Sequence, residues 1–390
     1  MTAPVGVGII GHGFLARTRS RCWARVFGVP VDKSFVAGRD PTRAAAFAEG
    51  HGWSRGGSID ELLSDPAIAV VDLCVPQSAH RELCERAAAS GKHVLCTKPL
   101  TAFTGQGCAQ GVAIASTDPR VMLERAMEDA KAMVDACARA GVQLFYGENW
   151  LFAPAFQRAA ALNAASNGVI LEMRGWESHS GSHSPYAKEW RHVGGGALLR
   201  LASHPIGAML WLKAREAARR GASSGKGTGT ARVERVTGAV ADVTRAIPSG
   251  APSDVATGWH DVESWGTATM HFGDGSVGTV FGSDVMMGGM QSHLTILASD
   301  HRLEVAMSPN DAVRSYAARD GTFGDEYMME KASGQAGWNH AMADEDTSSG
   351  QQGLVQHVAE CLATGRTTDC DGALGAEVVR VVYEAYAAAR

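Results

Sequence analysis

The amino-terminal segment constrains the fold of this chain most strongly. Residues 5–10 (VGVGII) are small or β-branched, which is typical of a buried parallel strand. Gly11 and Gly13 follow at once, and a segment suited to a helix begins at Phe14 and includes the small Ala16. Between a strand and a helix, the first glycine makes the turn, the second lets backbone approach a pyrophosphate, and the small third residue allows close packing. We therefore predict a dinucleotide-binding turn, with a tight turn that binds no ligand as the alternative.

The end of the second predicted strand bears on the choice of cofactor. Residues 34–37 are followed by Gly38, Arg39 and Asp40. NAD-specific domains usually place an acidic residue here for the ribose 2′-hydroxyl, whereas a glycine leaves room and a guanidinium pairs with a phosphate. The sequence favours NADP, and NAD stays open because Asp40 could take the acidic position. The structural alternative is that Arg39 is a solvated loop residue.

Strand and helix patterns alternate through the first half of the chain. In that half we expect strands at residues 69–75 and 93–96 and helices at residues 59–63 and 82–90, in the order of a parallel sheet. In the second half we expect strands at residues 233–243, 266–272, 278–283 and 293–297, a hairpin turn at 273–275, and helices at 351–363 and 373–389. A chain of 390 residues is too long for one ordinary core. We predict a dinucleotide-binding domain at residues 1–147 and a substrate-binding and oligomerisation domain at 148–390, whose last helices could pack back on the first domain.

Composition excludes several classes of partner. The net charge is −5 and no long basic run is present, which argues against a nucleic-acid partner. No stretch approaches the roughly 18 apolar residues of a membrane span, and the first residues lack the pattern of a signal peptide. The eight cysteines form no CxxC pair, which favours reduced thiols and a cytoplasmic location.

Two further motifs are similar to those of one enzyme family. A predicted strand ends before Pro76 and His80, and a later one runs into Lys98-Pro99-Leu100. In the second half, residues 194–199 (GGGALL) are followed by Ser203-His204-Pro205. In this order the motifs resemble the Gfo/Idh/MocA family of oxidoreductases over nearly the whole chain. The resemblance implies an α/β Rossmann domain plus an α+β C-terminal domain with a large, mainly antiparallel open sheet.

The resemblance also assigns residues to the cofactor and to the chemistry. Hydride transfer from a secondary alcohol to a nicotinamide needs a group that takes the hydroxyl proton. Lys98 and His204 match the family's catalytic lysine and histidine; the alternatives are a surface lysine and a packing histidine. The residues expected to bind NAD or NADP are Gly11, His12, Gly13, Phe14, Leu15, Gly38, Arg39, Pro76, His80, Lys98, Glu148 and Asn149.

Two positions depart from the family pattern. Thr97 stands where the family has a glutamate before the lysine, and Arg200 stands where many relatives have an aspartate four residues before the histidine. An arginine cannot act as a base at neutral pH. Arg200 therefore either binds an anionic group of the substrate or forms a salt bridge within its own domain.

A polar and aromatic cluster lies between residues 177 and 192. The pair His179 and His183 has the i,i+4 spacing of a helical metal site, but the surrounding serines and glycines favour a loop, so we expect no metal. A loop that lines a sugar site fits this composition better. The residues expected to bind substrate are Lys98, Glu177, His179, His183, Tyr186, Trp190, Arg200 and His204.

Three functions are compatible with these residues. The leading one is a nicotinamide-dependent oxidoreductase that acts on a ring hydroxyl or ketone of a sugar, glycoside or cyclitol. The first alternative is an NAD-dependent glycoside hydrolase that works by transient oxidation, for example on an anionic, sulfoquinovoside-like glycoside. The second alternative is a sensor that binds NAD(P) without catalysis. The partners expected are a small carbohydrate and further copies of the chain, as a dimer or tetramer.

Overall fold

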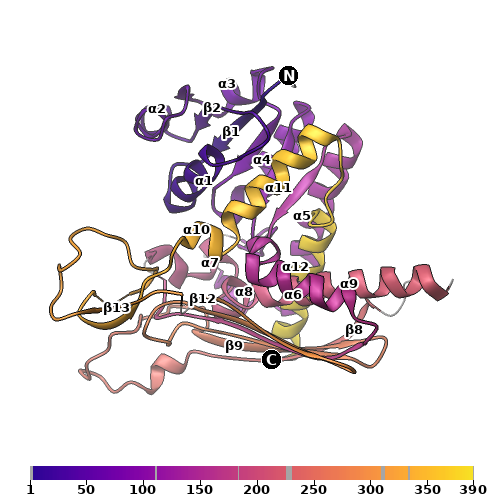
Figure 1. The fold of residues 1–390 in the computed structure, drawn as a ribbon, viewed down its shortest axis with the longest axis vertical. Helices are drawn as coiled ribbons and strands as arrows, with labels where there is room; N and C mark the ends of the chain where they lie inside the picture. Colours follow the sequence, from indigo (N-terminus) through magenta and orange to yellow (C-terminus); the bar gives the residue numbers. More distant parts are fainter. Residues whose placement is uncertain are drawn as a thin grey trace. The chain divides into compact units, whose positions relative to one another are not determined.

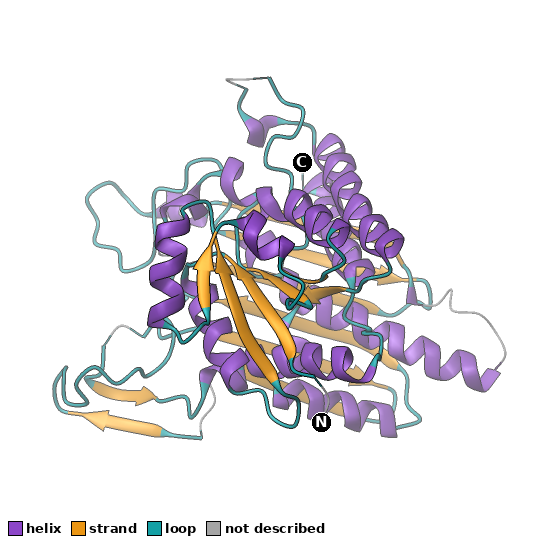
Figure 2. Ribbon diagram, turned by 90° about the horizontal axis from the view of Figure 1, so that it is seen from above, coloured by secondary structure: helices purple, strands orange, loops and turns teal. Residues whose placement is uncertain are grey.

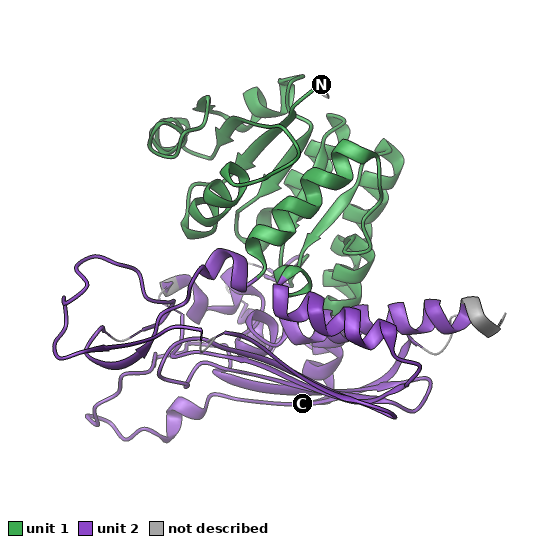
Figure 3. Ribbon diagram, viewed as in Figure 1, with its two compact units in different colours: residues 1–102, 124–152, 350–379 green, residues 103–123, 153–349, 380–390 purple. Residues whose placement is uncertain are grey.

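The computed structural model describes residues 3–109, 112–182, 184–224, 231–308, 312–332 and 334–389. The chain forms two compact units, coloured separately in Figure 3. Unit 1 comprises residues 1–102, 124–152 and 350–379, and unit 2 comprises residues 103–123, 153–349 and 380–390. Within the described part of the chain, no helix combines the length and hydrophobicity that a membrane crossing requires.

Unit 1 is built on a six-stranded, wholly parallel sheet (Figure 1). Its strands are β1 (Val5–Ile10), β2 (Val31–Ala37), β3 (Arg55–Gly57), β4 (Val70–Leu73), β5 (His93–Thr97) and β6 (Leu144–Gly147), in the order β3-β2-β1-β4-β5-β6. Its helices are α1 (Phe14–Ala24), α2 (Pro41–Gly50), α3 (Ile59–Ser64), α4 (His80–Ala89), η1 (Gln77–Ala79), η3 (Asn149–Phe152) and α11 (Gln351–Thr364). The strand order reverses beside β1, as in a doubly wound fold, so the predicted Rossmann architecture is confirmed.

The core of unit 1 joins segments from both ends of the chain. Helix α11 packs against α1, and its apolar side chains Leu354, Val355 and Val358 belong to the same buried cluster as Trp23 and Val36. Two longer helices, α5 (Pro119–Ala140) and α12 (Gly372–Ala388), each begin in one unit and end in the other. The division of the sequence at residue 147 stays a prediction.

Unit 2 is built on a second six-stranded sheet, in the order β12-β11-β7-β10-β9-β8. Its strands are β7 (Ile170–Ser178), β8 (Val233–Ala241), β9 (Trp265–Phe272), β10 (Val277–Ser283), β11 (Gln291–Ala298) and β12 (Arg302–Ser308). Only β7 and β10 pair in parallel among the described strands of this sheet. A separate hairpin of β13 (Arg314–Ala317) and β14 (Gly337–His340) stands apart from these strands in Figure 2. The predicted large, mainly antiparallel sheet is confirmed.

Helices cover one face of this sheet. Those that pack against its strands are α6 (Pro154–Ala165), α8 (Ala197–Arg200) and α9 (Ser203–Ser224). Unit 2 also contains α7 (Trp190–Val193), α10 (Glu345–Ser348) and the short turns η2 (Ile114–Ser116), η4 (Pro185–Lys188) and η6 (Val243–Ala246). Glycines on the covered face allow this approach: a Cβ at Gly175 would lie 2.7 Å from Pro205 of α9, and one at Gly282 would lie 2.4 Å from the Ala197 carbonyl oxygen of α8.

Strand β7 was not expected from the sequence. Its covered face carries Met173, Gly175 and Glu177, and its other face carries Glu172, Arg174 and Trp176. Leu171 is exposed where the pairing with β11 is irregular, so apolar residues do not alternate cleanly with polar ones. The prediction of a loop from residue 177 onward was wrong for Glu177 and Ser178, which end β7 and are buried.

Candidate functional site

The turn after β1 has the backbone conformation that the glycine motif predicts. Gly11 has a φ of +119°, and a Cβ there would lie 2.2 Å from the Cys74 carbonyl oxygen, so no larger residue fits. A Cβ at Gly13 would meet no atom within 4 Å. Ala16 is fully buried against the sheet. The turn is therefore tightly packed at Gly11 and open at Gly13.

The first turn of α1 is suited to an anion. Gly13 is its N-cap, no side chain caps its N–H groups, and its first turn carries no acidic residue. Such N–H groups, together with the helix dipole, favour a phosphate. Phe14 is 68% exposed, and His12 and Leu15 are half-buried. The residues present thus fit the pyrophosphate of a dinucleotide.

The three residues after β2 differ in whether their side chains are available to bind a cofactor. Gly38 directly follows the strand, and a Cβ there would lie 3.0 Å from the His12 ring. Asp40 is the N-cap of α2, where its Oδ1 accepts hydrogen bonds from the backbone N–H groups of Thr42 and Arg43. Arg39 is exposed. The acidic side chain is therefore engaged in capping a helix, and a cation stands beside it.

Pro76 and His80 follow β4 and have different surroundings. Pro76 is exposed and is the N-cap of η1. His80 is fully buried, with its ring nitrogens 3.0 Å from the carbonyl oxygens of Val75 and Leu100. Burial lowers the pKa of His80 below its usual value. These contacts give His80 a structural part, fastening the β4 loop to the segment after Lys98.

Lys98 and Glu148 leave the sheet side by side. Thr97, the last residue of β5, pairs with Gly147, the last residue of β6, so the next residue of each strand is Lys98 and Glu148. Glu148 is fully buried and Lys98 is half-buried. Burial raises the pKa of Glu148 to about 8, against the opposing effects of the nearby Lys98 and of the Trp150 N–H. Asn149, the next residue, is buried at the start of η3.

In unit 2, the three-glycine motif is held by a buried glutamate. Glu263 accepts hydrogen bonds from the N–H groups of Gly196 (3.0 Å) and Leu198 (3.0 Å) and from the Tyr386 hydroxyl (2.7 Å). A Cβ at Gly196 would lie 2.0 Å from the Glu263 carbonyl oxygen, and one at Gly195 would lie 2.4 Å from the Tyr386 hydroxyl. The glycines are therefore required by close packing, and the motif sets the start of α8 and the residues that follow it.

His204 lies in the first turn of α9, beside a carboxylate from β7. Its Nε2 is 3.7 Å from Glu177 Oε1, and both side chains are almost wholly buried. The Ser292 hydroxyl of β11 donates a hydrogen bond of 3.3 Å to Glu177 Oε2. The imidazole therefore lies within ion-pair distance of a carboxylate that accepts a hydrogen bond from a hydroxyl.

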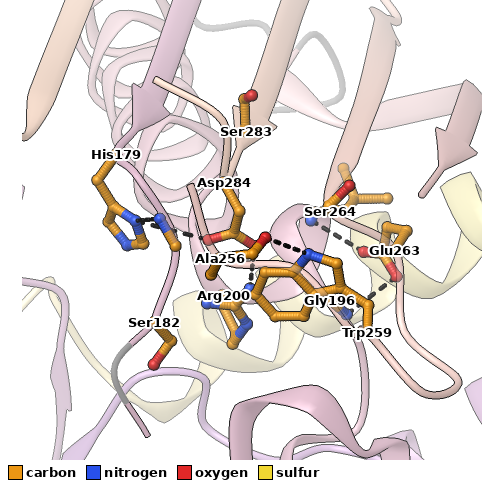
Figure 4. Close-up of polar contacts among 12 residues, drawn as sticks. His179, Ser182, Gly196, Arg200, Ala256, Trp259, Glu263, Ser264, Ser283 and Asp284 are labelled. Atoms are coloured by element: carbon orange, nitrogen blue, oxygen red, sulfur yellow. Dashed lines mark hydrogen bonds and ion pairs between the residues drawn. The ribbon is translucent and has the colours of Figure 1, made fainter. Parts of the chain in front are cut away.

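Arg200 forms an ion pair within unit 2. Figure 4 shows Asp284 between Arg200 and His179: its Oδ2 contacts the Arg200 guanidinium, and its Oδ1 is 3.5 Å from His179 Nδ1. The guanidinium also lies over the Trp259 ring, 5.4 Å from its centroid. Burial raises the pKa of Asp284, and Arg200 opposes this shift. Of the two roles considered for Arg200, the salt bridge is present, so its charge is already matched inside the protein.

The other residues of the predicted sugar-binding cluster differ in burial and in their contacts. Trp190 is 2% exposed, and its indole N–H donates a hydrogen bond of 2.9 Å to the Phe103 carbonyl, which makes it a packing residue. Tyr186 is 64% exposed and contacts the His192 ring edge-on. His183 lies outside the described residues. Among the described residues, no group of three or more His, Cys, Asp or Glu side chains could hold a metal ion.

Three residues that contact the candidate site residues were not predicted from the sequence. Glu263, Asp284 and Ser292 form the cited contacts with residues 65 to 115 positions away in the sequence. One signal was available: Asp284 directly follows the strand pattern of β10, and a charged residue at a strand end often serves a site.

Comparisons with known proteins agree with this architecture. Residues 5–124 match a model described as "Oxidoreductase family, NAD-binding Rossmann fold", and residues 158–306 match the "GFO/IDH/MocA C-terminal domain". Two solved structures share the fold over the chain: GenD2 from gentamicin A biosynthesis in complex with NAD (TM-score 0.77, 22% identity, covering 100% of this chain and 95% of that one), and levoglucosan dehydrogenase with NADH and levoglucosan (TM-score 0.70, 21% identity, covering 99% and 97%).

Curated relatives are similar over shorter stretches. Levoglucosan dehydrogenase of Pseudarthrobacter phenanthrenivorans is 30% identical over 216 residues, 52% of this chain and 49% of that protein. The 1,5-anhydro-D-fructose reductase of Ensifer adhaerens is 30% identical over 203 residues, 50% of this chain and 53% of that protein. The NADP-dependent D-xylose 1-dehydrogenase 2 of Haloferax volcanii is 31% identical over 139 residues, 35% and 36% of the two chains. The chain therefore spans about half or less of the length of these relatives.

Proposed function

Because this chain belongs to the Gfo/Idh/MocA family of oxidoreductases, we propose that it transfers a hydride between a nicotinamide cofactor and a ring carbon of a sugar. The observation that carries the proposal lies in unit 1. At the start of α1 no side chain caps the N–H groups and the space around Gly13 is open, and Lys98 directly follows β5 of the same sheet. The relatives named as sugar dehydrogenases and reductases support the substrate class.

Each unit has its own part in this proposal. In unit 1, the α1 N-terminus binds the pyrophosphate, and Lys98 takes the proton of the sugar hydroxyl. When bound, the nicotinamide supplies the hydride acceptor or donor. In unit 2, we propose a role in proton transfer for His204, which lies beside Glu177. Because Arg200 is paired with Asp284, we propose a neutral sugar, and the anionic group considered from the sequence loses its main support.

We further propose that the cofactor is NADP rather than NAD. Gly38 has no side chain, Arg39 is exposed beside it, and Asp40 caps α2 through Oδ1. A cation without a competing free carboxylate favours the 2′-phosphate.

A panel assay tests the proposed function. Purified protein is incubated with NAD⁺ or NADP⁺ and a set of neutral and acidic sugars, cyclitols and nitrophenyl glycosides. Reduced nicotinamide that accumulates with neutral sugars supports the proposal. Release of nitrophenol that needs cofactor but leaves no reduced nicotinamide would instead indicate a glycosidase, and cofactor binding without either product would indicate a sensor.

Replacing Glu177 with glutamine is expected to lower kcat about 10²-fold, because the neutral amide no longer stabilises the protonated His204 ring. The variant is nearly isosteric, so cofactor affinity and folding should be unchanged. Steady-state kinetics with the best sugar measure the effect. The matched control is Glu172→Gln on the same strand, whose carboxylate is on the uncovered face beside Arg174; equal kcat values for the two variants would remove His204 and Glu177 from the mechanism.

We also propose that the uncovered face of the unit 2 sheet binds a second copy of the chain. The Trp176 ring stacks there on Phe281, at a centroid distance of 5.5 Å, and on His293, at 4.8 Å. All three side chains are partly exposed. Such a contiguous aromatic patch on a flat sheet suits an interface.

Light scattering is expected to give at least twice the chain mass for the wild type and a smaller mass for Trp176→Glu, since the charge would be buried in the interface. Lys131→Glu, at a position whose side chain is 76% exposed in unit 1, serves as the control. A monomeric wild type, or an unchanged mass for Trp176→Glu, would contradict this interface.

A further inference from the structure

Thr97 creates a gap in the chemistry proposed above. The residue before the lysine has no carboxylate in this chain, and a half-buried ammonium group is stabilised by a neighbouring anion. A buried lysine without an anionic partner loses its proton easily and has no fixed orientation. The neighbouring strand carries a carboxylate that could meet this need, at Glu148.

Strand register brings the two groups together. Strands β5 and β6 are parallel and pair Val94 with Leu144 through Thr97 with Gly147, without a shift. Parallel neighbours lie about 4.8 Å apart, so the residues that follow the last pair leave the same edge at adjacent positions. The approach of the two strand ends is close: a Cβ at Gly147 would lie 2.8 Å from the Thr97 Cα.

The surroundings of Glu148 make its charge depend on Lys98. The side chain is fully buried, its Oε1 accepts the Trp150 N–H at 3.1 Å, and Lys98 is the charged group that acts on it. Tyr146 of β6 and Cys370 lie near it, and Cys96 of β5 lies near Tyr146. Burial raises the pKa of all three groups far above their usual values, so all three stay neutral. Arg19 of α1 approaches the same strand end at Gly147 and is ion-paired with Asp72 at 3.6 Å.

We infer that Glu148 is the positioning residue for Lys98: supplied by the next strand, its carboxylate replaces the one missing at position 97 and controls when Lys98 carries a proton. This inference rests on the proposed function for the role of Lys98, but the pairing itself concerns only unit 1. When Glu148 is ionised, Lys98 is held as an ammonium. When Glu148 is protonated or replaced by an amide, Lys98 loses its proton at a lower pH.

The protonation of Lys98 can be measured without cofactor or substrate. The full chain is labelled briefly with an amine-specific acylating reagent over a range of pH, and mass spectrometry follows Lys98, with the exposed Lys131 as the internal standard. In Glu148→Gln, the labelling midpoint of Lys98 is expected to fall by about 1–3 pH units, the shift that an adjacent opposite charge produces. The Lys131 midpoint should not move.

Two further variants separate an electrostatic role from a structural one. Glu148→Asp keeps the charge and should retain most of the wild-type midpoint, and Thr97→Glu with Glu148→Gln should restore it by returning the carboxylate to the preceding residue. Glu82→Gln, at an exposed position of α4, controls for a general loss of charge. An unchanged Lys98 midpoint in Glu148→Gln, or a midpoint in the double variant that stays at the Glu148→Gln value, would overturn the inference.

The same series has a kinetic readout if the enzyme oxidises a sugar. The pH at which kcat rises should shift down in Glu148→Gln together with the labelling midpoint, and it should return in the double variant. Absence of any sugar oxidation in the wild type would count against the proposed function alone, since the labelling experiment does not depend on it.

Discussion

Replacing Lys98 with methionine is expected to lower kcat by about 10²- to 10⁴-fold, because the variant keeps the length of the side chain but has no group that takes the hydroxyl proton. Cofactor binding should change little, since we propose that the pyrophosphate binds at the N-terminus of α1, whereas Lys98 follows β5. Cofactor fluorescence titration and initial rates measure the two effects separately.

The choice of control makes this result specific. Lys131→Met removes an exposed lysine from α5, in the same unit, and should leave both kcat and cofactor affinity unchanged. A Lys98→Met enzyme with more than about a tenth of the wild-type kcat would show that Lys98 is no general base or acid in this reaction.

The second large effect is expected for stability. Replacing Glu263 with alanine leaves the Leu198 N–H and the Tyr386 hydroxyl without their acceptor in a buried site, and it leaves the Gly196 N–H only its longer bond of 3.2 Å to the Tyr386 hydroxyl. An unsatisfied buried polar group costs about 1–3 kcal/mol, so the free energy of unfolding of unit 2 should fall by about 3–5 kcal/mol. Denaturant unfolding measures the loss, and hydrogen exchange at Gly196 and Leu198 localises it.

The position of the loss matters as much as its size. Because Glu263 fixes the start of α8, faster exchange should extend to Arg200 and His204, and activity should fall with it. Glu234→Ala, at an exposed position of β8, should change stability by less than about 0.5 kcal/mol. Equal stability of the two variants would mean that Glu263 does not hold the glycine motif.

Short sequence patterns predicted the parts of the fold that are formed by residues close together in the sequence. The turn of Gly11 and Gly13 and the small Ala16 follow from what a strand, a tight turn and a helix need within twelve residues of sequence. Of the strands predicted in the second half, β9 and β10 alternate buried and partly exposed positions, and the hairpin turn at residues 273–275 joins them.

Residues that act across long sequence distances could not be found in this way. Arg200 looks like a free cation until Asp284, which lies 84 residues later, is placed beside it. The partner of His204 is in a strand whose apolar residues do not alternate, so Glu177 was expected in a loop. Glu148 was a candidate, but its relation to Lys98 depends on the register of β5 and β6, which no single segment encodes.

A single-turnover measurement tests whether the protein transfers a hydride from a sugar to the nicotinamide with the help of Lys98. Wild type and Lys98→Met, each saturated with the same NADP⁺ and at enzyme excess, are mixed with a neutral sugar deuterated at the reacting carbon. We expect the wild type to transfer one deuterium to the nicotinamide of each cofactor reduced. The variant should bind the cofactor equally well but transfer the deuterium at least about 10²-fold more slowly. Equal transfer rates in the two proteins, or no transfer from any sugar to a bound cofactor, would contradict this expectation.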